Sequence, residues 1–129
     1  MKLDKDTMIA CEWMKYVRGG SEVAETLYSV GRFSVFADLA GIKLHLVPRD
    51  VVVNHILGQG WRKLMRGPKY PKSTDSKIRV QLLSRFGCSS PPKKGEHLHG
   101  ITGHEWQALA VAMYLWDDYR RDLPCGLRY

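Results

Sequence analysis

The first part of the chain changes its pattern of apolar residues twice. Residues 7–13 (TMIACEW) show almost no polar alternation, which is typical of a strand buried on both faces of a mostly parallel sheet. Helical spacing follows over residues 21–40, with Ser21 placed to cap the first turn and Gly41 placed to end the helix. Residues 42–47 (IKLHLV) alternate apolar and polar side chains, which predicts a second strand. The order strand, helix, strand predicts a right-handed crossover between two parallel strands.

The middle of the chain is predicted to be helical, with loops where glycine and proline gather. Residues 48–57 are expected to form a short helix that opens at a proline and ends at a Gly-Gln-Gly turn. Residues 61–74 contain a glycine and two prolines among basic residues, so we expect a loop there. Thr74 or Asp75 is then expected to cap a helix that Gly87 stops.

The last and most regular helix is expected to begin after a loop over residues 88–101. Thr102 and Glu105 have the spacing of a capping box, in which Glu105 has a structural role at the helix start. The helix fades near Arg121, and its apolar stripe contains Trp106, Leu109, Ala110, Met113 and Trp116. Together these elements predict an α/β fold, with a short parallel sheet flanked by helices, in a single domain over residues 1–129.

The composition narrows the class of protein. Apolar residues make up 44% of the chain, which indicates a packed core and argues against general disorder. The three cysteines are odd in number and far apart, so we expect a reducing compartment rather than a disulfide framework. No apolar run approaches the roughly 20 residues of a membrane span, and the N-terminal residues lack a signal-peptide pattern. These features predict a cytoplasmic protein that does not associate with membranes.

Positive charge concentrates in one segment and indicates a class of partner. Residues 1–60 hold seven Lys or Arg against seven Asp or Glu, whereas residues 61–129 hold thirteen against six. Residues 61–95 alone hold ten against one, which is typical of a surface that binds a polyanion. The alternative is a solvated, mobile loop. The residues expected to contact nucleic acid are Arg62, Lys63, Arg66, Lys69, Tyr70, Lys72, Lys77 and Arg79.

Two aromatic residues, Trp61 and Tyr70, lie among these basic residues. Basic residues interleaved with aromatics suit phosphate neutralisation combined with base stacking, which is the pattern of single-strand or junction binding. The alternative for Trp61 is that it packs on the core beneath a solvated loop.

Three sets of side chains are candidates for chemistry. The Glu12 carboxylate ends a strand predicted to be buried, where it needs a cation or metal unless the strand exits to solvent. His104 and Gln107 are three residues apart, which puts them on one face at the start of the last helix, where phosphate binds well. A structural zinc site is the third candidate, although its spacing matches none of the paired patterns that place two ligands on one turn. The side chains that would hold zinc are Cys88, His97, His99 and His104.

The order of motifs over residues 9–113 resembles the last two-thirds of RuvC-type Holliday junction resolvases, which have a three-layer RNase H-like fold. Six motifs in order carry the resemblance. They are IACEW, the helix SEVAETLYSVGRFSVFADLAG with its central Gly31, the segment GIKLHLVPRDVVVNHI, the turn Gly58-Gln-Gly60, the helix start Lys77-Ile-Arg-Val80, and His104-Glu-Trp-Gln107-Ala-Leu-Ala.

The resemblance implies a function in DNA recombination, with branched DNA as the partner. The family cleaves a phosphodiester with two divalent cations, Mg²⁺ or Mn²⁺, and a metal-bound water as the nucleophile. By this resemblance Glu12 matches the catalytic strand glutamate, His104 and Gln107 match the two metal-ligand positions of the last helix, and Lys77 matches a basic residue that approaches the DNA backbone.

The chain departs from the family at two metal ligands. The family's first catalytic aspartate lies on an opening strand that this chain lacks, so we expect an N-terminally truncated version of the fold. The family's final aspartate is Gln107 here, a neutral amide that adds no charge for a second cation. The resemblance therefore predicts at most one weakly held Mg²⁺ or Mn²⁺, with Glu12 and His104 as its ligands.

Three functions remain open on the sequence. The first is a catalytically silent relative of the resolvases that binds branched or single-stranded DNA. The second is an active, Mg²⁺-dependent, phage-type endonuclease whose first catalytic strand precedes this chain. The third is an interaction protein whose open sheet edge pairs with another chain, either in a homodimer or with a different partner.

Overall fold

The computed structural model describes residues 7–13 and 21–121, and the chain forms two compact units. The first unit contains residues 1–49 and the second contains residues 50–129. Among the expectations above, the N-terminal residues and the third cysteine, Cys125, lie outside the described residues. The predicted Ser21 cap lies outside them as well, because only the backbone of residues 21–23 is described.

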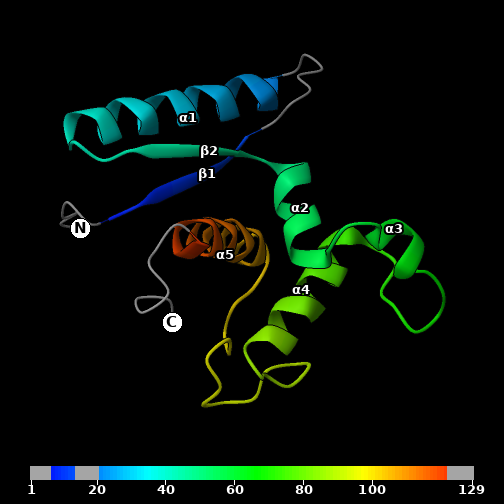
Figure 1. The fold of residues 1–129 in the computed structure, drawn as a ribbon. Coiled ribbons are helices and arrows are strands. Elements are labelled where there is room, and N and C mark those ends of the chain that lie inside the picture. Colours follow the sequence, from blue (N-terminus) through cyan, green and yellow to red (C-terminus); the bar gives the residue numbers. More distant parts are fainter. Residues whose placement is uncertain (1–6, 14–20, 122–129) are drawn as a thin grey trace. The chain divides into compact units, whose positions relative to one another are not determined.

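The first unit is a strand, a helix and a strand. Strands β1 (Ile9–Trp13) and β2 (Leu44–Pro48) are parallel, with Ile9 paired to Leu44 and Trp13 to Pro48. Helix α1 (Ser21–Leu39) connects them and lies alongside β2 (Figure 1). The predicted parallel pair is confirmed, and with it an α/β class for the described chain.

Gly41 ends α1 as its position predicts. Its φ of 69° is in the left-handed region that favours glycine. The amide of Ile42 donates to the carbonyl of Ala37 at 2.9 Å, and the amide of Gly41 donates to that of Asp38 at 3.2 Å. This pair of bonds is a Schellman motif, which satisfies carbonyls left open at the end of the helix.

The prediction that β1 is buried on both faces is wrong. All five of its residues are half-buried, because the described sheet has only two strands and a single helix of this unit packs beside it. The buried apolar residues of this unit are Ala37, Ile42 and Val47.

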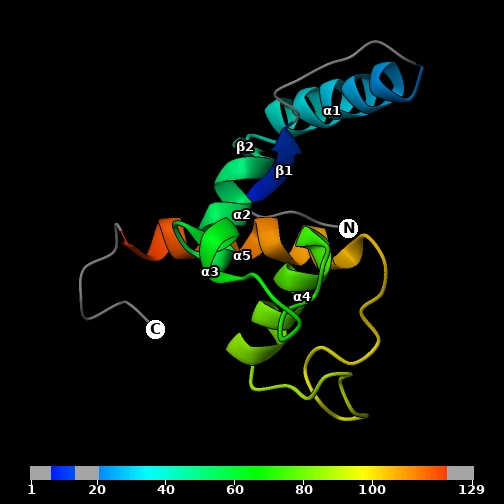
Figure 2. The ribbon, with the colours of Figure 1, turned by 90° about the vertical axis from the view of Figure 1, so that its right-hand side faces the viewer.

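The second unit is built from helices. They are α2 (Arg49–Leu57, which starts at the unit boundary), α3 (Trp61–Leu64), α4 (Thr74–Arg85) and α5 (Glu105–Arg121). Helices α4 and α5 pack against each other (Figure 2). The buried apolar residues of this unit are Val52, Val53, Leu57, Trp61, Ile78, Leu82, Leu83, Leu98, Trp106, Ala110, Val111 and Leu115.

The prediction of an uninterrupted loop over residues 61–74 is wrong, because α3 forms at its start. Gly60, with φ 76°, turns the chain, and its carbonyl accepts from the amides of Lys63 and Leu64. Burial of Trp61, which is only 8% exposed, holds this turn against the rest of the unit. An apolar anchor thus overrides a composition that is typical of a loop.

Both ends of α4 are capped by side chain or backbone. The N-cap is Ser73, not Thr74 or Asp75, because the Ser73 hydroxyl accepts from the amide of Ser76 at 3.1 Å. The predicted stop at Gly87 is confirmed. Gly87 has φ 66°, and the amide of Cys88 donates to the carbonyl of Leu83 at 2.8 Å.

Helix α5 begins at the predicted capping box. The Glu105 carboxylate accepts from the amide of Thr102 at 2.9 Å, which confirms its structural role. The predicted apolar stripe is only partly right: Trp106 and Ala110 are buried, whereas the other three predicted residues are half-buried. The buried face is completed by Val111 and Leu115, so it is rotated from the predicted one. No helix of the described residues is long and apolar enough to cross a membrane.

Candidate nucleic-acid interface

The predicted nucleic-acid contacts begin on α3 and continue through the segment before α4. The side chains of Arg62, Lys63, Arg66, Lys69 and Lys72 are all exposed. They follow one another along a single stretch of the second unit. The only Asp or Glu between Trp61 and Gly95 is Asp75. The stretch from Arg62 to Lys72 therefore carries five positive charges and contains no Asp or Glu.

Trp61 is the anchor of this stretch rather than a free stacking platform. Its indole Nε1 donates to Asn54 Oδ1 at 3.2 Å, and its ring is buried. The guanidinium of Arg62 lies 5.1 Å from the centre of the ring, and the ammonium of Lys77 lies 5.7 Å from it. The interpretation of Trp61 as a core residue is therefore confirmed, and its ring fixes two of the basic side chains by cation–π contact.

Two further hydrogen bonds give this basic stretch a defined shape. Arg66 Nε donates to the carbonyl of Arg62 at 2.9 Å, and Lys77 Nζ donates to the carbonyl of Lys72 at 3.1 Å. Tyr70 is half-buried, with the ammonium of Lys69 5.5 Å from its ring centre. These contacts argue against the alternative of a wholly solvated, mobile loop.

Residues at the start of α5 and in the first turns of α4 line an open pocket of about 320 Å³. It brings together three residues predicted for binding or catalysis: Arg79, exposed His104 and half-buried Gln107. The guanidinium of Arg79 lies 5.2 Å from the ring centre of Trp106, which orients it at the pocket. The lining residues are Asp75, Ser76, Ile78, Arg79, Gly103, His104, Trp106 and Gln107.

Asp75 and Ser76 also line this pocket, although the sequence did not predict them as site residues. Their spacing gives a partial signal, because Asp75 and Arg79 are four residues apart and so share one face of α4, but it does not specify that α5 packs on that face. The pocket thus holds a carboxylate, a guanidinium, an imidazole, an amide and a hydroxyl above an apolar floor. Such a set of donors and acceptors suits the polar edge of a nucleobase as well as a phosphate.

Glu12 lies in the first unit, whereas His104 and Gln107 lie in the second. A guanidinium nitrogen of Arg49 lies 3.6 Å from the Glu12 carboxylate. The positive charge next to Glu12 in this structure is therefore that of an arginine. The Glu12 side chain is 29% exposed. It is therefore neither fully buried nor fully open to solvent, which were the two alternatives for the end of this strand. Burial, and then the charge of Glu12, raise the pKa of the adjacent Cys11 thiol, which keeps that thiol protonated at neutral pH.

The donor set does not fit a two-metal centre. Within the described residues, no three His, Cys, Asp or Glu side chains gather in a way that could hold a metal ion, and this includes the four residues weighed for zinc. In the α4–α5 pocket, His104 and Gln107 offer an imidazole nitrogen and an amide oxygen, neither of which supplies the negative charge of a carboxylate. Two divalent cations need several anionic oxygens to offset their mutual repulsion.

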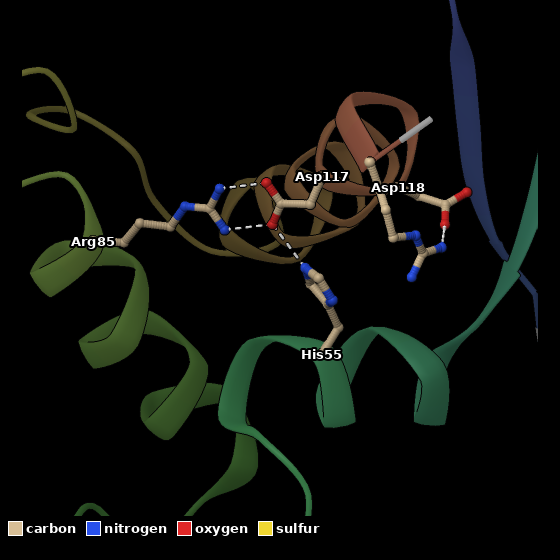
Figure 3. A network of polar contacts seen from close by, with 5 residues as sticks. His55, Arg85, Asp117 and Asp118 are labelled. Atoms are coloured by element: carbon tan, nitrogen blue, oxygen red, sulfur yellow. Dashed lines mark hydrogen bonds and ion pairs between the residues drawn. The ribbon is translucent and has the colours of Figure 1, made fainter. Parts of the chain in front are cut away.

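A polar network that the sequence did not predict joins α2, α4 and α5. The Asp117 carboxylate accepts from both terminal nitrogens of Arg85, at 2.5 and 2.6 Å, and lies 2.7 Å from His55 Nε2 (Figure 3). The hydrogen bond from Arg85 is the main reason that the pKa of Asp117 falls to about 2, and the bond from His55 adds to it. The His55 ring also meets Tyr114 edge-on, with centres 5.2 Å apart.

This network joins α2, α4 and α5 within the second unit, which also carries the candidate interface. His55 and Arg85 are 62 and 32 residues from Asp117, so no local spacing indicates the contact. Asp118 of the same helix does not join the network and pairs with Arg121 three residues on, as helical spacing allows (Figure 3). Asp117 and Asp118 are neighbours in sequence with different roles.

A scan against protein-family models and searches among curated proteins and solved structures found no match to this chain. The resemblance to the resolvases therefore rests on the order of the six motifs, and the function rests on the site.

Proposed function

We propose that this protein binds nucleic acid through the basic stretch of its second unit, as a catalytically silent relative of the RuvC-type resolvases with an RNase H-like fold. The observation that carries the proposal is the run of exposed Lys and Arg from Arg62 to Lys72 next to a pocket that contains Arg79. Phosphate contacts of this kind supply affinity without reading sequence.

The way in which the basic side chains are held supports the proposal. Arg62, Lys77 and Arg79 each lie over a buried tryptophan ring, at 5.1 to 5.7 Å from its centre. Side chains that are already oriented lose less conformational entropy when a phosphate binds. A solvated charge run has no such contacts.

Tyr70 and the α4–α5 pocket favour branched or single-stranded DNA over continuous duplex. Both need a base whose face or edge is free of a partner, which junctions and single strands provide. In the pocket, Gln107 and Asp75 can pair with the polar edge of such a base while Arg79 meets its phosphate. Tyr70 is the candidate for stacking.

The test is DNA affinity as a function of salt, measured by fluorescence anisotropy on a four-way junction, a single strand and a duplex. About six phosphate contacts give a log–log slope near −5 on duplex, a loss of roughly 10³ in affinity between 50 and 200 mM salt. Replacing Arg62, Lys63, Arg66 and Lys69 together with alanine is expected to flatten the slope by about 3–4 units.

Two matched double variants test whether the salt dependence comes from the basic stretch itself or from the total positive charge of the protein. Arg66→Ala/Lys69→Ala and Arg32→Ala/Lys43→Ala each remove two exposed positive charges, from the second and the first unit. Only the former is expected to flatten the slope, by about 2 units. An equal effect of both pairs, or a wild-type affinity that does not depend on salt, would overturn the proposal.

Metal-dependent cleavage of DNA distinguishes the proposed silent relative from the alternative, an active endonuclease. We expect no cleavage of four-way junctions above background in Mg²⁺ or Mn²⁺, because Glu12 is paired with Arg49 and Gln107 is neutral. Gln107→Asp is expected to raise Mn²⁺ affinity in calorimetry through its added charge, without restoring cleavage. Metal-dependent cutting by the wild type that Glu12→Ala abolishes would establish the endonuclease instead.

The sheet edge favours a second candidate function, as an interaction protein. Within the described residues β1 pairs only with β2, so each strand has one edge without a strand partner. Such an edge can add a strand from a second copy or from another protein. Light scattering separates this candidate from DNA binding alone, because it predicts a homodimer or a stable complex in the absence of DNA.

A further inference from the structure

The segment between α4 and α5 is a structured loop. Consecutive turns run along it, with the amide of Glu96 donating to the carbonyl of Lys93 at 3.0 Å and the amide of His99 donating to the carbonyl of Glu96 at 3.1 Å. Leu98 is only 4% exposed and anchors the loop to the core. Gly95 permits the first turn, because its φ of 94° is unfavourable for other residues.

Glu96 closes this loop with three hydrogen bonds. Its carboxylate accepts from the hydroxyl and the amide of Ser89, both at 2.8 Å, and from the amide of Lys93 at 3.2 Å. The bonds from Ser89 are the main cause that lowers the pKa of Glu96, so the carboxylate is charged at neutral pH. It is the only carboxylate between Cys88 and Ile101.

The closed loop carries two adjacent exposed lysines, Lys93 and Lys94. Lys93 and Lys94 are exposed, and their ammonium groups make no hydrogen bond or ion pair with any residue that the structure describes. The Glu96 carboxylate makes its hydrogen bonds with main-chain and hydroxyl donors, and the charge of Lys93 acts on it only at longer range. The loop therefore carries two adjacent, exposed positive charges on a backbone that hydrogen bonds hold in place.

We infer that residues 88–100 form a second phosphate-binding element, in which Lys93 and Lys94 contact the nucleic-acid backbone and Glu96 is a positioning residue. The inference rests on the proposed function and extends it to a loop outside the stretch from Arg62 to Lys72. The two elements lie at opposite ends of α4 (Figures 1 and 2). The length of that helix, about 18 Å at 1.5 Å per residue, corresponds to about five base steps.

Two variants test the element on a 20-base-pair duplex and on a four-way junction. Lys93→Ala/Lys94→Ala is expected to flatten the salt slope by about 2 units, since each phosphate contact contributes about 0.9. Arg32→Ala/Lys43→Ala is the control with the same loss of charge. An unchanged slope for the lysine variant, while the wild type binds, would overturn this inference and leave the proposed function intact.

Glu96→Ala distinguishes two explanations of binding by this loop: lysines positioned by the loop backbone, or positive charge alone. The two explanations predict opposite changes in DNA affinity. The substitution adds one positive charge, so simple electrostatics predicts tighter binding. We expect at least threefold weaker binding instead, with faster hydrogen exchange at the amides of Ser89 and Lys93, and an intermediate effect for Glu96→Gln. Asp38→Asn, which adds the same charge in the first unit, is the control. Tighter binding by Glu96→Ala would overturn the inference, and absence of wild-type binding would remove it together with the proposed function.

Discussion

The two units of this protein differ in how far their apolar side chains are buried. Among the described residues, three apolar side chains are buried in the first unit and twelve in the second. Seven large apolar side chains are exposed in the first unit and three in the second. The exposed ones of α1 include Tyr28, Phe36 and Leu39, the last 85% exposed. The second unit thus has a core of its own, whereas the first has mainly a strand pair and a helix with an apolar surface.

The same division holds for polar contacts and charge. The second unit carries the Asp117 network and the Glu96 loop, and tryptophan rings lie under three of its basic side chains, those of Arg62, Lys77 and Arg79. The packed core and the concentration of positive charge therefore occur in the same unit, and a phosphate-binding site needs both a supporting scaffold and basic side chains. We expect most of the stability to reside in the second unit.

The largest expected effect is a cavity in the core of the second unit. Leu82 is completely buried, so Leu82→Ala is expected to lower the free energy of unfolding by about 2–5 kcal/mol. The matched variant in the first unit, Leu39→Ala, removes the same atoms from an exposed site and is expected to cost less than about 0.5 kcal/mol. Urea unfolding followed by circular dichroism measures both. Equal losses would contradict the contrast in burial.

Glycine substitutions at two matched helix ends sharpen the comparison further. Gly41 and Gly87 have nearly the same φ, 69° and 66°, and an added Cβ meets no atom within 4 Å at either site. Alanine is therefore expected to cost about 1–2 kcal/mol at each, through backbone strain alone. If the units unfold separately, Gly87→Ala shifts the main transition and Gly41→Ala leaves it in place. A shift of the main transition by both would show one cooperative unit.

A smaller, pH-dependent effect is expected from the Asp117 network. Its pKa of about 2 is below the usual 3.8, so the folded state is stabilised above pH 4 and this contribution is lost as the pH falls toward 2. After allowance for solvent screening, Asp117→Asn is expected to cost about 1 kcal/mol at pH 7. The difference from wild type, measured by urea unfolding between pH 7 and 2, is expected to vanish at the acid end. Asp118→Asn on the exposed side is the control, and a similar loss there would contradict the role of the network.

The sequence predicted the features that depend on local chemistry. The parallel strand pair, the two helix ends at Gly41 and Gly87 and the capping box at Glu105 each depend on a few neighbouring residues, and all are confirmed. The features that the sequence did not predict depend on residues that are far apart along the chain. Burial of Trp61 creates α3 inside a loop-like composition, and the contact of Asp117 with His55 joins residues 62 positions apart.

The candidate site was predictable in part for the same reason. Charge density indicated the basic stretch, and helical spacing indicated that His104 and Gln107 share a face, as the pocket that both line bears out. The membership of Asp75 and Ser76 required the packing of α4 on α5, which periodicity does not specify. The binding of nucleic acid itself stays a prediction.

The tryptophans beneath the basic side chains give the protein a built-in optical reporter. Arg62 and Lys77 lie over Trp61, and Arg79 lies over Trp106. A positive charge beside an indole ring perturbs its excited state, so moving that charge toward a phosphate alters the emission. Binding of a polyanion to either region is therefore visible in the intrinsic fluorescence of the unlabelled protein, and Trp61→Phe and Trp106→Phe assign the signal to one region or the other.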